Sequence, residues 1–427
     1  MSAGPSVEDL LAYLDASPTP YHAAAEAARR LAAAGSVEVA LAGPWTGAPA
    51  RGHIRADGAL VAWILPDGGP PAPSLRLVGA HTDSPGLRIK PRPDTGAAGW
   101  RQLGVEVYGG ALVNSWLDRD LGLAGRVAVR SDDGSVATHL VRVDEPVLRV
   151  PQLAIHLDRE LSTQGLKLDR QRHLTPVWGV GTPEPGAFRR DLASRLDVAP
   201  ERIGGWDLMV HDLTPAAVVG TDRSLVASGR LDDLCACWAG LVALAGIEPE
   251  GDRAAVLVLF DHEEVGSTST RGAGGPLLAD VLERLVAARG GTRSDLLAAL
   301  PASALASADM AHATHPNHAE RHEPGHWVAV DGGPVVKVNA NQRYATEPAT
   351  QAAFEAACDR AGVPFQYFVG HNEVPCGSTI GPLAAAGLGL PTVDVGVAQL
   401  AMHSARELCG REDPLRMAAA LGQWFLG

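Results

Sequence analysis

The sequence predicts an α/β protein with a mixed sheet flanked by helices and interrupted by a β-rich insertion. Two strand-like apolar runs, Leu75–Ala80 and Ala254–Phe260, each lead directly into charged residues. From Ser224 to the C-terminus, strands and Ala/Leu-rich helices alternate, which suits a sheet covered on both faces. Between about residue 105 and residue 150 the chain changes to valine-rich alternation, which favours β-structure.

The amino-terminal region is expected to be helical. Ser6 followed by Asp9 is a capping-box pattern for a short helix through Leu14. Pro20 suits the first turn of a second helix, which Gly35 would close.

The valine-rich region predicts a β-hairpin. The alternating runs Gly125–Arg130 and Val136–Val143 are joined through Asp132-Asp-Gly134. Further along, Leu234–Ile247 is the longest apolar stretch and is too short to span a bilayer, so it predicts a buried helix. The segment Ser404–Glu407 has a second capping-box pattern and predicts that His403 stands where a loop meets a helix.

Composition limits the classes of protein to consider. A chain of 427 residues with 46% hydrophobic residues predicts two domains, or one large domain with an insertion. The formal net charge of −13 argues against nucleic acid or an anionic membrane as a partner. The five cysteines are unlike a secreted disulfide framework and no secretory signal is visible, so a cytoplasmic protein is expected.

The chemistry is expected at the ends of the two apolar runs. Glu263 and Glu264 follow one run, where one carboxylate could hold a metal and the other accept a proton from water. His81 and Asp83 follow the other run and lie two residues apart, so Asp83 could orient the imidazole while His81 binds the metal. Together these residues indicate a hydrolytic metal centre.

Other candidate ligands have local explanations that compete with metal binding. Asp232 and Asp233 precede the predicted buried helix, where capping is as good an explanation as a ligand role. Asp309 would locally be read as a helix cap or turn residue. The histidines between residues 312 and 326 superficially resemble a zinc cluster, but the surrounding Pro and Gly residues favour a loop or an intersubunit surface, and we exclude them from the metal site.

Two other catalytic classes lack their motifs. The Gly-rich segment Gly377–Gly381 is not a Gly-x4-Gly-Lys-Ser/Thr nucleotide loop, and no Gly-x-Ser-x-Gly elbow indicates a serine hydrolase.

Motifs along nearly the whole chain resemble, in order, those of the aspartyl aminopeptidases, which are dinuclear zinc exopeptidases. The matching segments are Ser17–His22, Gly79–Pro85, Pro151–Leu157, Ser228–Asp232, Asp261–Ser267, Ser307–Ala313, Asn339–Thr346, Pro375–Pro382 and Ala401–Ser404. The resemblance implies a zinc exopeptidase-like catalytic domain formed by residues 1–92 and 223–427. It also implies that residues 93–222 are an inserted dimerisation or lid domain.

Carried over by position, the resemblance implies two Zn²⁺ ions per subunit, with Mn²⁺ or Co²⁺ as substitutes. Asp232 would bridge the two ions, and Glu263 would be the general base. His81 and Asp309 would complete the coordination of one ion, and Glu264 and His403 that of the other.

The resemblance also implies the substrate and the assembly. Lys337 would meet the acidic side chain of an N-terminal Asp or Glu, and an ordinary strand-edge lysine is the alternative. His156 would reach a neighbouring subunit's active site, and a buried core histidine is the alternative. Family members assemble as dodecamers from dimers, so a homo-oligomer is expected.

Two departures from the family pattern leave every proposed ligand in place; one bears on metal affinity or pH dependence and the other on the shape of the specificity pocket. Asp233 stands where Asn is more usual, and Glu373-Val374 replaces a pair that usually contains Asp. The hypothesis is therefore a metalloaminopeptidase for peptides with an acidic N-terminus. The alternatives are a related dinuclear aminopeptidase or deacylase that prefers neutral substrates, and a metal-containing scaffold without activity.

Overall fold

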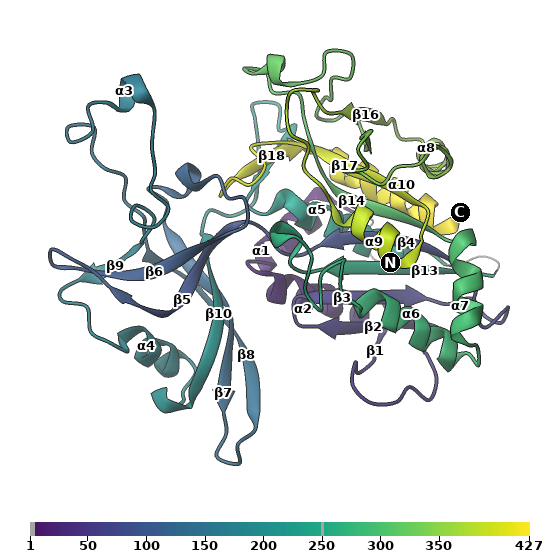
Figure 1. Cartoon of the computed structure of the whole chain (residues 1–427), viewed down its shortest axis with the longest axis horizontal. Coiled ribbons are helices and arrows are strands. Elements are labelled where there is room, and N and C mark those ends of the chain that lie inside the picture. Colours follow the sequence, from purple (N-terminus) through teal and green to yellow (C-terminus); the bar gives the residue numbers. More distant parts are fainter. Residues whose placement is uncertain (1–4, 249–251) are drawn as a thin grey trace. The chain divides into compact units, whose positions relative to one another are not determined.

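The computed structural model describes residues 5–248 and 252–427. Residues 1–4, on which part of the expectation of no secretory signal rests, lie outside the described residues. The chain divides into two compact units (Figure 1). The first comprises residues 1–83, 216–402 and 407–427, and the second comprises residues 84–215 and 403–406.

The first unit is built on a mixed sheet, as the sequence predicts. Over the described residues this sheet has 12 strands, with the order β1-β2-β3-β13-β4-β14-β17-β18-β12-β11, while β15 pairs with β16 and β17. The strands are β1 (Val37–Glu38), β2 (Arg51–Ala56), β3 (Ala59–Ile64), β4 (Ser74–His81), β11 (Ala217–Val219), β12 (Leu225–Ser228), β13 (Arg253–Phe260), β14 (Ala304–His312), β15 (Val335–Val338), β16 (Gln366–Val369), β17 (Thr392–Leu400) and β18 (Glu407–Gly410).

Helices cover both faces of this sheet because its central strands are apolar on both sides. In β4, Leu77 belongs to one hydrophobic core and Val78 to the other, as expected where successive side chains point to opposite faces. One core includes residues of α1 (Val7–Ala16), α2 (Pro20–Ala33), α5 (Leu231–Gly246), α8 (Pro348–Ala361) and α10 (Asp413–Leu426). The other includes residues of α6 (Leu277–Ala288) and α9 (Ile380–Leu388), and Leu296 of α7 (Arg293–Ala299).

Several local predictions are confirmed. The Ser6 side chain caps α1 by accepting a hydrogen bond from the Asp9 backbone. Pro20 begins α2, and Gly35 follows its end with a positive φ of 87°. The long apolar stretch forms the buried helix α5. No described helix has both the length and the apolar character needed to cross a bilayer.

The second unit is β-rich. Over the described residues it contains an antiparallel six-stranded sheet with the order β8-β7-β10-β5-β6-β9. Its strands are β5 (Gly86–Thr95), β6 (Trp100–Tyr108), β7 (Leu121–Arg130), β8 (Val136–Leu148), β9 (Val177–Val180) and β10 (Ile203–Asp212), and its helices are α3 (Leu161–Gln164) and α4 (Ala187–Arg195). Strands β7 and β8 form the predicted hairpin.

The helix predicted after His403 is wrong. Glu407 begins strand β18, which pairs with β12 and β17. The Glu407 side chain accepts a hydrogen bond from the backbone N–H of Asp232, so it is not available to cap a helix.

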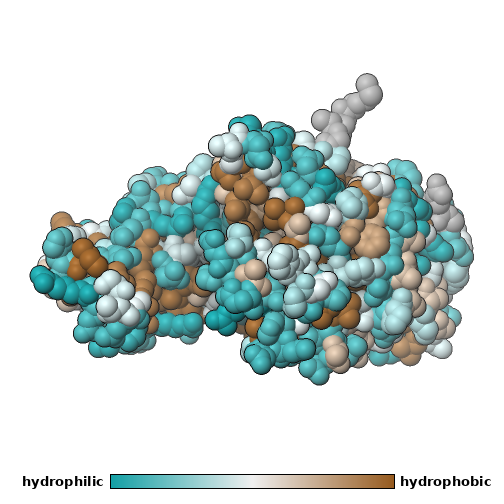
Figure 2. Space-filling model, turned by 90° about the horizontal axis from the view of Figure 1, so that it is seen from above, coloured by the Kyte–Doolittle hydropathy of each residue, from teal (hydrophilic) through white to brown (hydrophobic). Residues whose placement is uncertain are grey.

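The exposed surface is mixed in polarity. Figure 2 shows hydrophilic residues over much of one face, with hydrophobic residues in separate patches.

Candidate metal centre

Parallel strands of the first unit bring the predicted residues to one edge of the sheet. Strands β4 and β13 are parallel, with His81 opposite Phe260. A short 3₁₀ turn over Glu263–Val265 follows β13, and Asp309 lies on β14, which pairs in parallel with β4. The carboxyl ends of parallel strands are the usual location of ligand sites in such sheets.

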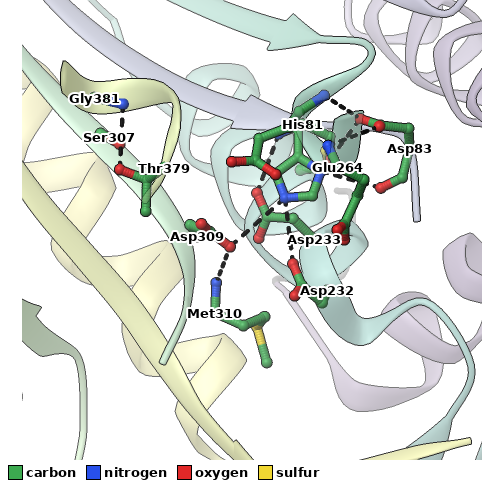
Figure 3. A network of polar contacts seen from close by, with 12 residues as sticks. His81, Asp83, Asp232, Asp233, Glu264, Ser307, Asp309, Met310, Thr379 and Gly381 are labelled. Atoms are coloured by element: carbon green, nitrogen blue, oxygen red, sulfur yellow. Dashed lines mark hydrogen bonds and ion pairs between the residues drawn. The ribbon is translucent and has the colours of Figure 1, made fainter. Parts of the chain in front are cut away.

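His81, Asp232 and Asp309 converge at this edge (Figure 3). The His81 Nε2 atom lies 3.2 Å from Asp232 Oδ1 and 3.6 Å from Asp309 Oδ1. One ligand atom from each residue lies within 4.8 Å of the others, and all three residues are buried. An imidazole nitrogen with carboxylate oxygens is a donor set that Zn²⁺ accepts, so these residues fit the predicted metal.

A second group contains His81, Glu263 and Glu264, whose ligand atoms also lie within 4.8 Å of one another. Both glutamates are partly buried beside the first group. His403 belongs to the segment 403–406 of the second unit, so its assignment as a ligand stays a prediction.

Asp83 holds the imidazole and the glutamate turn together. Its carboxylate oxygens accept hydrogen bonds from the backbone N–H groups of Glu263 and Glu264, at 3.0 and 3.1 Å. His81 Nδ1 lies 3.0 Å from the Asp83 carbonyl oxygen and 3.4 Å from its carboxylate Oδ1. A contact of this kind orients a metal-binding imidazole so that the other ring nitrogen faces the metal.

Burial and the neighbouring charges raise the pKa values of several carboxyl groups at this site. Burial raises the pKa of Glu263 to about 7; the carboxylates of Asp309 and Asp232 add to the rise, and the His81 charge opposes it. Burial likewise raises the pKa values of Glu264 and Asp233 well above their ordinary range.

The pKa of His81 is raised, which favours its positively charged form. Burial alone would lower the pKa of His81, but hydrogen bonds to Asp232, Asp309 and Asp83 hold it well above its ordinary value. Buried carboxylates are costly without a compensating cation. The cluster therefore has the electrostatic character of a cation site.

Lys337 lies beside this cluster and is not an ordinary strand-edge lysine. It is 1% exposed, on a strand paired on both sides by β16 and β17. Its ammonium donates to the Met310 carbonyl oxygen at 3.2 Å and lies 3.8 Å from Asp309 Oδ2. The Tyr344 ring lies below it, with 5.2 Å between Nζ and the ring centre.

His156 is exposed in the second unit, so the interpretation as a buried core histidine is wrong. It lies in a turn between β8 and α3, where the neighbouring Leu153, Ile155 and Leu157 are 56%, 53% and 75% exposed. The apolar neighbours of His156 suggested burial. The sequence alone does not distinguish apolar residues of a core from those of an exposed patch.

The predicted histidine loop is also present. His312 ends β14, and the following histidines lie in irregular structure up to His326. With His371 and Cys376, these two histidines help to line a cavity of about 200 Å³. Within the described parts of the chain, the groups with metal-binding geometry all contain His81 or Asp232.

Sequence reasoning missed two buried acids that support the centre. Glu407 accepts a hydrogen bond from the Asp232 backbone at 3.1 Å. Asp394 is fully buried on β17 and accepts hydrogen bonds from Ser307 and Thr379. The available signal was an isolated acid inside the apolar run Thr392–Ala398.

Residues 13–425 match the family described as aminopeptidase I zinc metalloprotease, M18. A Streptomyces coelicolor protein named probable M18 family aminopeptidase 2 is 54% identical over 418 residues, which cover 97% of this chain and 96% of the relative. The protein of the same name from Mycobacterium tuberculosis is 51% identical over 424 residues, covering 98% of this chain and 97% of the relative.

Solved structures share the whole fold. Ape4, from a cryo-EM structure of its complex with Nbr1, superposes with a TM-score of 0.94 at 34% identity, covering 98% of this chain and 85% of that chain. A subunit of the S. cerevisiae mApe1 dodecamer superposes with a TM-score of 0.85 at 27% identity, covering 98% of this chain and 96% of that chain.

Proposed function

Because this chain belongs to the M18 family of zinc aminopeptidases, which are peptide hydrolases, we propose that it removes unblocked N-terminal Asp or Glu from peptides. The observation that carries the proposal is a buried lysine beside a buried cluster of His81 and carboxylates. The cluster fits the hydrolytic centre, and the lysine supplies a local cation in a protein of net charge −13.

The proposed ligands are His81 and Asp309 for one Zn²⁺, Glu264 and His403 for the other, and Asp232 as the bridge. Mn²⁺ or Co²⁺ would be able to substitute, because both also accept nitrogen and oxygen donors. Bound cations at this position would polarise the scissile carbonyl, anchor the free amine and lower the pKa of the attacking water.

Glu263 is the proposed general base. Its carboxylate would accept a proton from the attacking water and return it to the nitrogen of the leaving amine. A pKa raised by burial to about 7 suits a group that gains and loses a proton near neutral pH. Asp83 fixes the backbone of Glu263 through its hydrogen bond and thereby aims the carboxylate.

Lys337 is the proposed determinant of acidic specificity. Its charge is held 3.8 Å from Asp309, a proposed ligand, and so close to the reaction centre. A carboxylate of the substrate next to a buried ammonium forms a charge-assisted contact, which a leucine side chain cannot form.

The proposed active form is a homo-oligomer, a dodecamer assembled from dimers through the second unit. One relative of known structure, S. cerevisiae mApe1, is a dodecamer. The exposure of His156 and its apolar neighbours supports a role at a subunit contact. A cytoplasmic location is also proposed, because the five cysteines are all free thiols.

The test is release of the N-terminal residue from matched Asp-Ala-Pro and Leu-Ala-Pro peptides. Turnover is measured before chelation, after chelation, and after zinc or manganese is restored. We expect faster cleavage of the Asp peptide, loss on chelation and recovery with metal. Metal-dependent cleavage that favours Leu would replace acidic with neutral specificity, and no turnover by folded, metal-loaded protein would favour the scaffold alternative.

A further inference from the structure

Asp394 is a buried acid that the proposed chemistry does not use. It is 0% exposed on β17, and it is neither a proposed ligand nor the proposed base. A carboxylate without contact to water is costly unless hydrogen bonds and an opposite charge compensate it. The compensation around Asp394 comes from segments that surround Lys337.

The hydrogen bonds to Asp394 join three separate segments. Its Oδ1 accepts from Ser307 Oγ on β14 and from Thr379 Oγ1 at the start of α9, both at 2.6 Å. Its Oδ2 accepts from the Ala345 backbone N–H at 2.5 Å. Figure 3 shows Ser307 and Thr379 on the Asp309 side of the cluster.

The same carboxylate leaves no space at the start of α9. A Cβ atom added to Gly381 would lie 2.5 Å from Asp394 Oδ2, closer than such atoms approach in proteins. Asp394 on β17 therefore fixes the start of α9 in addition to its contacts with β14 and with the Ala345 backbone.

Asp394 is linked to Lys337 by position and by charge. The two residues are paired across the antiparallel strands β15 and β17, so their side chains lie on the same face of the sheet. Burial raises the pKa of Asp394, and the positive charge of Lys337 opposes that rise. The acid and the lysine thus offset each other's charge in the interior.

A hydroxyl connects the backbones of the same pair. Thr346 Oγ1 accepts from the Asp394 N–H at 2.9 Å and donates to the Lys337 carbonyl oxygen at 2.6 Å. The residue before Ala345 is Tyr344, whose ring lies below the Lys337 ammonium. Asp394 is therefore linked by hydrogen bonds to strand β15, which carries Lys337, and to the segment that contains Tyr344.

We propose that Asp394 is a positioning residue for substrate specificity: it holds Lys337 in the place that an acidic N-terminal side chain requires. This inference rests on the proposed acidic specificity. Asp309 is a proposed metal ligand whose charge would be shared with a cation. Asp394 is then a second carboxylate, outside the proposed ligand set, whose charge balances that of Lys337.

The test is a double-mutant cycle with Asp394→Asn, Lys337→Met and the double variant, assayed on matched Asp-Ala-Pro and Leu-Ala-Pro peptides. Asn keeps the volume and one acceptor oxygen but removes the charge. We expect Asp394→Asn to lower kcat/KM for the Asp peptide by about 10-fold or more, mainly through a higher KM, as for the loss of a charge-assisted contact. The Leu peptide should change by less than about threefold, since it does not use the lysine charge.

The cycle separates positioning from mere structural support. In the Lys337→Met background, Asp394→Asn should cause little further loss on the Asp peptide, because the charge that it positions is gone. Equal losses on both peptides, or the same loss with and without Lys337, would overturn the inference. Asp212→Asn is the matched control, because Asp212 is a buried, hydrogen-bonded acid of the second unit.

Three further outcomes are distinguishable. If Asp394→Asn does not fold, Thr346→Val removes the hydroxyl between the same two backbones, and it should also weaken cleavage of the Asp peptide selectively; equal loss on both peptides would overturn the inference. A wild-type enzyme that prefers the Leu peptide would refute the proposed acidic specificity and this inference with it. Acid preference that survives Asp394→Asn would refute the inference alone.

Discussion

Replacing the proposed base with its neutral isostere should stabilise the metal-free protein, and the gain should depend on pH. Burial raises the pKa of Glu263 from 4.5 to about 7. A carboxyl with a raised folded-state pKa prefers to stay protonated, so the folded state loses stability as pH rises from 4.5 towards 7. Glu263→Gln removes that titration.

The size of the stability difference follows from the pKa shift of Glu263. The difference 7 − 4.5 is 2.5 pKa units, and at about 1.36 kcal/mol per unit the full cost is about 3 kcal/mol above pH 7. At pH 5.5 the unfolded carboxyl is already ionised and the folded one is not, so the cost falls to about 1 kcal/mol. The metal-free variant should therefore exceed the metal-free wild type by about 2 kcal/mol more at pH 8 than at pH 5.5.

The assay is urea denaturation of both proteins after chelation, at pH 5.5 and pH 8 and at one fixed protein concentration, since assembly also affects apparent stability. The raised pKa of His81 acts in the same direction in both proteins and largely cancels in the difference. Restored zinc should shrink the advantage of the variant. A difference that is equal at the two pH values, or larger at pH 5.5, would refute this account of the electrostatics.

Three other substitutions test separate parts of the site. Asp83→Ala removes the acceptor for the Glu263 and Glu264 backbones, so kcat should fall about 10- to 100-fold with zinc content by elemental analysis retained; unchanged kcat would contradict the role. Asp233→Asn keeps an acceptor for the His81 backbone N–H, so peptide cleavage should stay within about threefold while metal-free stability at pH 8 rises; a fall in that stability would be the wrong sign. His156→Ala changes an exposed residue, so the thermal midpoint should move little while turnover falls at least about 10-fold if the loop serves a neighbouring site; unaffected turnover would remove it from the substrate site.

Much of the fold was predictable because its signals are local. The strand-like runs that form β4 and β13 are mostly apolar, and the residues that the site needs stand at or just after the end of each. The hairpin of β7 and β8 follows from alternation around a turn containing Gly134. These features depend on backbone periodicity and turn chemistry, which one sequence contains in full.

The missed features depend on long-range contacts. Glu407 was expected to cap a helix, but its partner is the backbone of Asp232, 175 residues away along the chain. Asp394 draws its hydrogen bonds from residues 87 and 15 positions away. No local pattern specifies such partners, because sheet order brings them together only after folding.

The assignment of His81, Asp232 and Asp309 depends on both local sequence and long-range contacts. Each had an ordinary local explanation in the sequence, and only their convergence within 4.8 Å gives the set the geometry of a metal site. The resemblance of the ordered motifs nevertheless predicts all three as metal ligands, and that assignment stays a prediction.

The most direct test of the account is a zinc titration of the metal-free enzyme, with bound metal and release of N-terminal Asp measured on the same samples of wild type, Glu263→Gln and Asp232→Asn. Glu263→Gln should bind as much zinc as the wild type but lose turnover by at least about 100-fold, as for loss of a general base. Asp232→Asn should lose both zinc and turnover. Wild-type turnover by Glu263→Gln, or full zinc binding by Asp232→Asn, would contradict the assignment of base and bridge.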